Sequence, residues 1–176
     1  MKDNYILGLN IYHGDSSACL MKNGEIIFAI EEERINRIKH WAGFPIESIK
    51  SCLNYENILL ADISFIAVNT NPFSNILHKI KYGLNNFSKI NFYLKKLIIK
   101  KKKLSFQKIL EKEFVLNKIP KIKFYDHHLC HLASSHYPSN YNNSLIISAD
   151  GFGDFTSTCA AVGFKNKIEI KHKVLF

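Results

Sequence analysis

The chain of 176 residues is 47% hydrophobic and 22% charged, and its formal net charge is +9. This composition excludes a disordered or fibrous protein, and the length suffices for one domain with a buried core. The four cysteines lie far apart without a CxxC pair, which argues against a disulfide framework or a zinc knuckle and favours a reducing, cytoplasmic location.

The first thirty residues predict three strands in series. Apolar segments at 5–10, 17–22 and 25–30 follow one another closely, and Asn23-Gly24 is a strong hairpin signal between the last two. An antiparallel meander therefore opens the fold. The apolar patch at the N-terminus breaks at Asn10, and no run of about 18 apolar residues occurs, so neither an export signal nor a membrane span is predicted.

A helix and a strand come next. Pro45 can begin a helix because its missing amide is not needed in a first turn, and apolar residues recur at helical spacing from Ile46 to Leu53. Residues 63–69 are a nearly continuous apolar run rich in β-branched side chains, which is typical of a strand covered on both faces.

The segment from Phe73 to Lys118 is helical in pattern and strongly basic. It holds twelve lysines against two glutamates, a balance of +10, so the rest of the chain sums to −1. The basicity thus belongs to one segment, and nucleic acid is not the expected partner of the domain. One interpretation is an inserted pair of helices with a solvated lysine face; the other is that Lys95–Lys103 binds an anionic partner such as RNA or a lipid head group.

The chain then alternates between strands and a helix. Residues 121–125 predict a short strand, a helix begins at Asp126, and residues 144–150 form another apolar strand. A glycine-rich turn, an alternating strand at 158–162 and a last strand after a turn at 165–167 complete the pattern. The expected fold class is α/β.

A candidate metal site lies in "DHHLCHLASSHY". The carboxylate of Asp126 can cap the helix, and His127 and His131 then stand one turn apart on the same face, where two imidazoles can share a metal. Asp150, at the end of the next strand, is well placed as an oxygen ligand. The alternative is that these histidines are ordinary polar residues of a helix.

Two turns carry further candidates. Gly151 and Gly153 can let main-chain amides approach phosphate oxygens, although a plain hairpin turn gives the same pattern. His13 and Asp15 can serve acid–base chemistry or bind a polyol, or they can belong to a hydrogen-bonded polar turn. The cluster "EEERINRIKH" at 31–40 fits either surface salt bridges or a cationic wall for a phosphorylated substrate.

Two segments together resemble one enzyme family. "YHGDSSACLMKNGEIIFAIEEERINRIKHWAGFP" is similar to the opening of the nodulation- and antibiotic-type O-carbamoyltransferases, and "DHHLCHLASSHYPS" with "LIISADGFGDFTST" resembles that family's metal segment. The resemblance covers most of residues 5–163, and 73–118 is the least similar stretch.

The resemblance implies an actin-like, sugar-kinase-like ATPase fold (ribonuclease H-like), as in the related tRNA threonylcarbamoyl transferases. We expect residues 1–143 to form a first half-domain with a mixed sheet, flanking helices and a basic helical insertion at 73–118. Residues 144–176 would be the opening strands of the second half. Full-length relatives hold a further metal ligand, the rest of the cleft and a domain that makes carbamoyl adenylate. The expectation is therefore a truncated member that cannot complete catalysis alone and that a second polypeptide could complement.

The resemblance also implies roles for individual residues. His127, His131 and Asp150 would bind Fe²⁺ or Zn²⁺, and the glycine turn would face ATP or carbamoyl adenylate. The residues expected at the nucleotide are Gly151, Gly153 and Asp154.

The implied reaction transfers a carbamoyl group from carbamoyl adenylate, made from ATP and carbamoyl phosphate, to a hydroxyl of a sugar or secondary metabolite. His13 and Asp15 are the candidates for orienting or deprotonating that hydroxyl. The competing hypothesis is a non-catalytic metal- or nucleotide-binding module.

Overall fold

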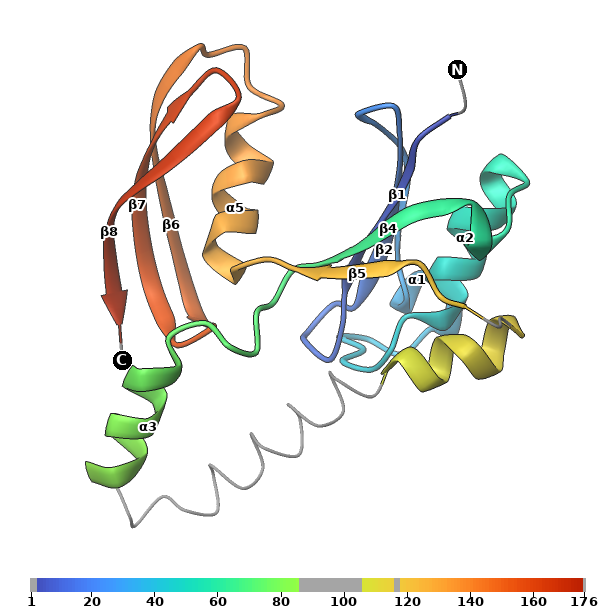
Figure 1. Ribbon diagram of the computed structural model, residues 1–176, viewed down its shortest axis with the longest axis horizontal. Coiled ribbons are helices and arrows are strands. Elements are labelled where there is room, and N and C mark those ends of the chain that lie inside the picture. Colours follow the sequence, from blue (N-terminus) through green and yellow to red (C-terminus); the bar gives the residue numbers. More distant parts are fainter. Residues whose placement is uncertain (1–2, 86–105, 116–117, 176) are drawn as a thin grey trace. The chain divides into compact units, whose positions relative to one another are not determined.

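The computed structural model describes residues 3–85, 106–115 and 118–175 (Figure 1). The predicted Lys95–Lys103 basic run, and with it the middle of the expected 73–118 insertion, lies outside the described residues. The chain divides into two compact units, one made of Met1–Asn69 and Lys95–Phe124 and the other of Thr70–Leu94 and Tyr125–Phe176.

The first unit is built on a five-stranded mixed sheet. Its strands, in the order in which they lie side by side, are β3 (Glu25–Glu31), β2 (Ser17–Lys22), β1 (Tyr5–Asn10), β4 (Ile63–Val68) and β5 (Lys121–Phe124). The first three are antiparallel, while β4 runs parallel to β1 and β5 parallel to β4. The predicted meander is confirmed, with Asn23 and Gly24 both at positive φ in its hairpin turn.

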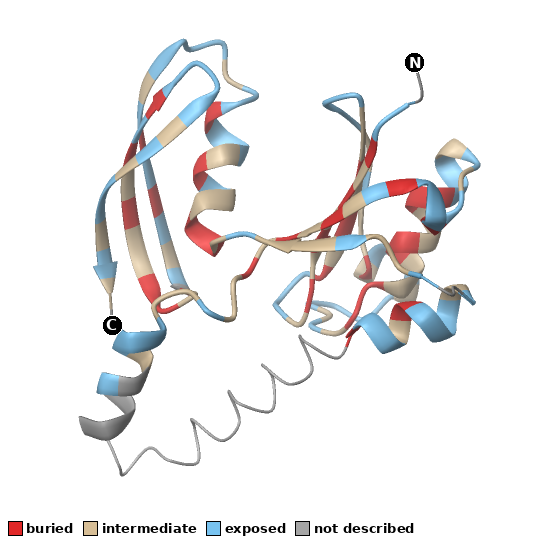
Figure 2. Cartoon of the chain, viewed as in Figure 1, coloured by how far each residue is buried: buried red, intermediate tan, exposed pale blue. Residues whose placement is uncertain are grey.

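Helical segments accompany this sheet. They are α1 (Glu33–Asn36), α2 (Ile46–Glu56), the short η1 (Leu60–Asp62) and the helical residues 106–114. The predicted helix begins at Ile46, with Pro45 at the N-cap position and not in the first turn, and α2 packs against β2 and β3. The core of the unit, which Figure 2 colours red on its strands and helices, includes the fully buried Leu7, Ile49 and Ile66.

The second unit is an antiparallel three-stranded sheet with a helix on one face. β6 (Asn143–Gly153), β7 (Thr156–Phe164) and β8 (Lys167–Leu175) lie in sequence order, and α5 (His127–His136) packs on β6 and β7. Its small core joins the helix to the sheet through Leu132, Ile146, Cys159 and Ala161. This unit also includes α3 (Ile76–Asn85).

The predicted α/β class, a mixed sheet with flanking helices followed by a second sheet, is confirmed. α5 belongs to the same compact unit as the second sheet, because Leu132 packs in the core with Ile146. The expected boundary between two half-domains at residues 143 and 144 stays a prediction. Among the described residues, no helix has the length and apolar character needed to cross a membrane.

The glycine segment differs from its prediction. β6 continues through Gly151 to Gly153, and the turn consists of Asp154 and Phe155, which have φ values of 50° and 70°. The structure thus places the glycines in an extended strand end, where the register with β7 shifts.

Candidate metal centre

The helix that carries the histidines begins where the sequence predicts. The carboxylate of Asp126 accepts a hydrogen bond from the Leu129 amide at 3.2 Å and so satisfies a donor of the first turn. The same carboxylate accepts from Ser74 Oγ at 3.0 Å and Lys173 Nζ at 2.9 Å. Burial acts to raise the pKa of Asp126, but the ion pair with Lys173 and these hydrogen bonds outweigh it and lower the pKa. The first turn of α5 is therefore anchored by an ionised cap.

Two further histidines of α5 are structural. His128 and His136 are buried at positions i and i+8 on the face that contacts the sheet. His128 lies 2.9 Å from Ser148 Oγ and 3.0 Å from the Thr156 carbonyl. His136 repeats the arrangement, at 2.8 Å from Ser144 Oγ and 2.9 Å from the Lys165 carbonyl. Each ring has a partner on both nitrogens, so neither histidine is available to a metal.

These contacts fix the helix against β6 in one register. Side chains alternate in a strand, so Ser144, Ile146, Ser148 and Asp150 share the face of β6 that meets α5. The two serines bind the structural histidines and Ile146 packs with Leu132. Asp150, the last of the series, is thereby brought to the histidine pair.

Three ligand atoms converge at that point. Nε2 of His127 lies 2.8 Å from Oδ2 of Asp150 and 3.0 Å from Nε2 of His131, and Nε2 of His131 lies 3.7 Å from the same carboxylate oxygen. A single proton on Nε2 of His127 can serve only one of its two close contacts. A cation among the three atoms would satisfy all of them, and the geometry of the donor set therefore fits a metal ion.

The spacing agrees with metal coordination. Ligands about 2.1 Å from a common ion lie about 3.0 Å apart at right angles and about 3.4 Å apart at tetrahedral angles. The three observed separations of 2.8, 3.0 and 3.7 Å bracket these values. Two imidazoles with one carboxylate and open positions suit Fe²⁺ or a catalytic Zn²⁺.

The protonation states also suit a metal. Partial burial and the neighbouring His127 lower the pKa of His131, against the opposing effect of Asp150, which favours the neutral ring that ligates metals. For Asp150, burial acts to raise the pKa, but hydrogen bonds from His127 and from the Gly151 amide outweigh it and lower the pKa. The carboxylate is thus held ionised.

Gly153 lets the buried ligand reach its position. A Cβ at residue 153 would lie 2.0 Å from Cδ2 of His127, far inside contact distance. At Gly151, by contrast, a Cβ would meet nothing within 4 Å. The structure therefore gives Gly153 a packing role beside His127, the buried candidate ligand, and the sequence did not predict this role.

The side chain of Asp154 is used to hold this region together. Its carboxylate accepts from the His127 amide at 3.0 Å, the Asn71 amide at 2.8 Å and Thr70 Oγ at 2.9 Å. Asn75 also donates to its carbonyl at 2.9 Å. The sequence did not predict that residues 70–75 bind Asp154. Nothing in the local pattern of this segment marks it as a partner of a turn about eighty residues later.

The predicted acid–base pair, His13 and Asp15, belongs to the first unit. Asp15 has a φ of 59°, and its Oδ1 lies 2.9 Å from Nδ1 of His40. The turn is braced by buried Ser16, whose Oγ lies 3.0 Å from the His13 carbonyl and 2.8 Å from the Gly43 carbonyl. His13 and Asp15 thus sit in an ordered turn, and their catalytic role stays a prediction.

The charged cluster at 31–40 is only partly a surface network. Arg34 forms salt bridges with Glu31 and Glu33, which agrees with the predicted network of surface salt bridges. Glu32, however, is buried, and its carboxylate accepts from the amide and hydroxyl of Ser48 at 2.7 and 2.6 Å. It caps the N-terminus of α2 from a distance, a role that local sequence does not reveal.

Comparison with known proteins identifies the family. A family model described as Carbamoyltransferase N-terminus matches residues 5–176, so the chain belongs to this family.

Individual similar proteins extend over most of the chain. The chain is 36% identical to nodulation protein NolNO of Sinorhizobium fredii, over 91% of this chain and 23% of NolNO. It is 30% identical to the uncharacterized protein sll1178 of Synechocystis, over 93% of this chain and 28% of that protein. The chain thus spans about a quarter of the length of these relatives. Among solved structures, YeaZ from Pseudomonas aeruginosa aligns with a TM-score of 0.47 and 10% identity, covering 98% of this chain and 67% of YeaZ.

Proposed function

We propose that this chain is the metal-binding N-terminal part of an enzyme that transfers a carbamoyl group from carbamoyl adenylate to a hydroxyl of a sugar or secondary metabolite. The observation that carries the proposal is the convergence of His127, His131 and Asp150 within one helix–strand pair. Family membership supplies the reaction class.

In the proposed site, the three side chains hold Fe²⁺ or Zn²⁺. Such an ion supplies Lewis-acid polarisation of a carbonyl or phosphoryl oxygen when bound. His127 is the buried ligand, fixed by Gly153 and by the helix cap, whereas the side chain of His131 is about half exposed and faces the open side of the site.

The chain's other residues have defined tasks in this proposal. His13 and Asp15 orient or deprotonate the acceptor hydroxyl, and the hydrogen bond between Asp15 and His40 gives the carboxylate a proton-carrying neighbour. The main chain at Gly151 has open space on its Cα side, where phosphate oxygens of ATP or carbamoyl adenylate can approach, although the Gly151 amide itself donates to Asp150. Gly153 and Asp154 act indirectly, because Gly153 leaves room for the ring of His127 and Asp154 accepts a hydrogen bond from the His127 amide.

Metal analysis tests the first half of the proposal. The purified chain should bind close to one equivalent of Fe²⁺ or Zn²⁺, measured by elemental analysis after dialysis. His127→Ala and His131→Ala should each lose it, and the exposed His172→Ala should retain it. Equal metal content in all four proteins would contradict the assignment of the ligands.

Activity tests the second half. We expect this chain alone to be inactive, and a fusion of the chain to the part of NolNO beyond the matched region to carbamoylate a hydroxylated acceptor when given ATP and carbamoyl phosphate. A metallated fusion without turnover on a broad acceptor panel would count against carbamoyl transfer.

A second candidate function is a non-catalytic metal-binding module. It is favoured by one observation, that all three ligands and their supporting contacts lie within the single unit made of α5, the second sheet and residues 70–75. This candidate predicts stoichiometric metal without turnover in either the chain or the fusion.

A further inference from the structure

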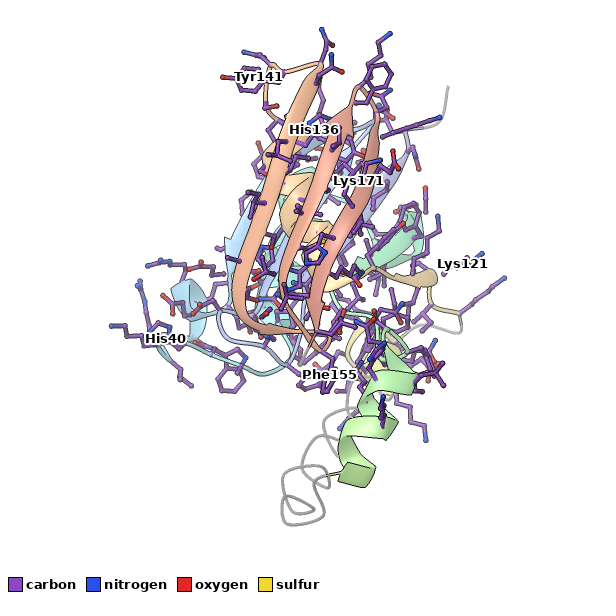
Figure 3. The ribbon with its side chains drawn as sticks, turned by 90° about the vertical axis from the view of Figure 1, so that its left-hand side faces the viewer. His40, Lys121, His136, Tyr141, Phe155 and Lys171 are labelled. Atoms are coloured by element: carbon purple, nitrogen blue, oxygen red, sulfur yellow. The ribbon has the colours of Figure 1, made fainter. Side chains whose placement is uncertain are left out.

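One face of the second sheet is apolar and exposed. Leu145 and Ile147 on β6 are 73% and 65% exposed, and Val162 and Phe164 on β7 are 38% and 54% exposed. These four residues alternate with buried ones along each strand, so they point away from the core that α5 closes. Figure 3 looks onto this side of the sheet, which is called the outer face below.

The outer face is a continuous patch. Leu145 lies directly opposite Val162 in the strand register, and Phe164 and Ile147 flank this pair one step along on either side. Antiparallel sheets that face water usually alternate apolar inward with polar outward residues. A contiguous apolar patch on a sheet therefore indicates a surface that another element covers.

The dimensions of the patch suit one helix. Two neighbouring strands with their side chains present a strip about 10 Å wide, the diameter of an α-helix. The residues from 143 to 147 extend about 14 Å along β6, which corresponds to about nine residues of helix. The neighbouring strand β8 does not continue the patch, because Lys167, Glu169 and Lys171 are exposed there.

Charge decides between possible occupants. Lys165 lies over the ring of Phe164 at 5.7 Å, and Lys167, Glu169 and Lys171 border the patch on β8, with Glu169 and Lys171 paired, so the border carries a net positive charge. A second copy of the chain would bring lysines against lysines. A helix with an apolar stripe and acidic flanks matches both the patch and its border.

We infer that the outer face binds an amphipathic, acid-flanked helix supplied by the part of a carbamoyltransferase that lies beyond the region matched by this chain. The relatives provide the length for it, since this chain covers 23% of NolNO and 28% of sll1178. The inference depends on family membership and not on the proposed metal or reaction.

Cysteine labelling can test the inference. Ile147→Cys places a thiol on the outer face beside the Leu145–Val162 pair, and Leu59→Cys, at a residue that is 72% exposed in the first unit, is the matched control. Both variants are made in the isolated chain and in its full-length fusion to the remainder of NolNO. The rate of maleimide addition is followed by mass spectrometry after chymotryptic digestion. Cleavage after Tyr141 and Phe152, and after Tyr55 and Phe65, gives peptides that contain each new cysteine and no native one.

The expected result is that residue 147 reacts at least tenfold more slowly in the fusion than in the isolated chain, while residue 59 reacts equally in both. Equal rates at residue 147 would overturn the inference. So would slow labelling in the isolated chain that accelerates on dilution, because a second copy would then cover the face. A fusion that aggregates while NolNO itself is monodisperse also counts against it, because the face would then not accept the remainder.

Discussion

Replacing Gly153 with alanine should strongly weaken metal binding although no proposed ligand is substituted. A Cβ at this position would lie 2.0 Å from Cδ2, 2.6 Å from Cγ and 2.8 Å from Nε2 of His127. Non-bonded carbon atoms are comfortable at about 3.5–4.0 Å. The imidazole must therefore move by about 1.5 Å, or the strand must move instead.

The consequence for the metal follows from this displacement. Coordination tolerates deviations of about 0.2 Å in ligand distance, so a ring shifted by about 1.5 Å no longer ligates. Altered neighbours of metal ligands typically cost about 10–100-fold in affinity, and we expect Gly153→Ala to reach at least the upper end. Crowding of the packed region should also lower the free energy of unfolding by about 1–3 kcal/mol.

Titration calorimetry with Zn²⁺ and thermal unfolding measure the two effects, and Gly151→Ala is the matched control because a Cβ there meets nothing within 4 Å. The stability loss should shrink when Gly153→Ala is combined with His127→Ala, since the crowded ring is then absent. Zn²⁺ affinity of Gly153→Ala equal to that of the control would refute the reasoning.

Two other predictions concern histidines outside the metal centre. His128→Ala should reduce the free energy of unfolding by about 2–4 kcal/mol in chemical denaturation, because it leaves Ser148 Oγ and the Thr156 carbonyl unpaired around a buried cavity; a loss below 1 kcal/mol would contradict this role. The hydrogen bond and charge of Asp15 raise the pKa of His40 above its ordinary 6.5, so Asp15→Asn should lower it in an NMR titration. Because the folded-state pKa is raised, this pair stabilises the fold fully below about pH 6.5, and the contribution is lost as the pH rises through the pKa of folded His40. An unchanged His40 titration in the variant would show that Asp15 is not the cause.

Much of the fold could be predicted from local pattern. The meander of β1 to β3, the start of α2 at Pro45 and the cap of α5 at Asp126 all follow from turn chemistry and periodicity within about ten residues. Such signals act between neighbours along the chain, where the sequence itself sets the geometry.

The three proposed metal ligands could be predicted for a related reason. His127 and His131 are one helical turn apart, so the helix alone brings them together. Asp150 could be expected from its position at a strand end, but its approach to within 2.8 Å depends on the register of α5 against β6. The contact between His128 and Ser148 helps to set this register. In the sequence, these two residues are only separate polar positions in a helix and in a strand, and nothing there pairs them.

The sequence by itself determined the meander, the helices α2 and α5, the histidine pair and the family, because helical spacing and family motifs are properties of the linear chain. Only the tertiary structure decided that Gly153 makes room for His127, that Glu32 caps α2 from inside and that the outer face of the second sheet is bare. These features depend on contacts between residues far apart in the chain, and such contacts exist only after packing has chosen which faces meet.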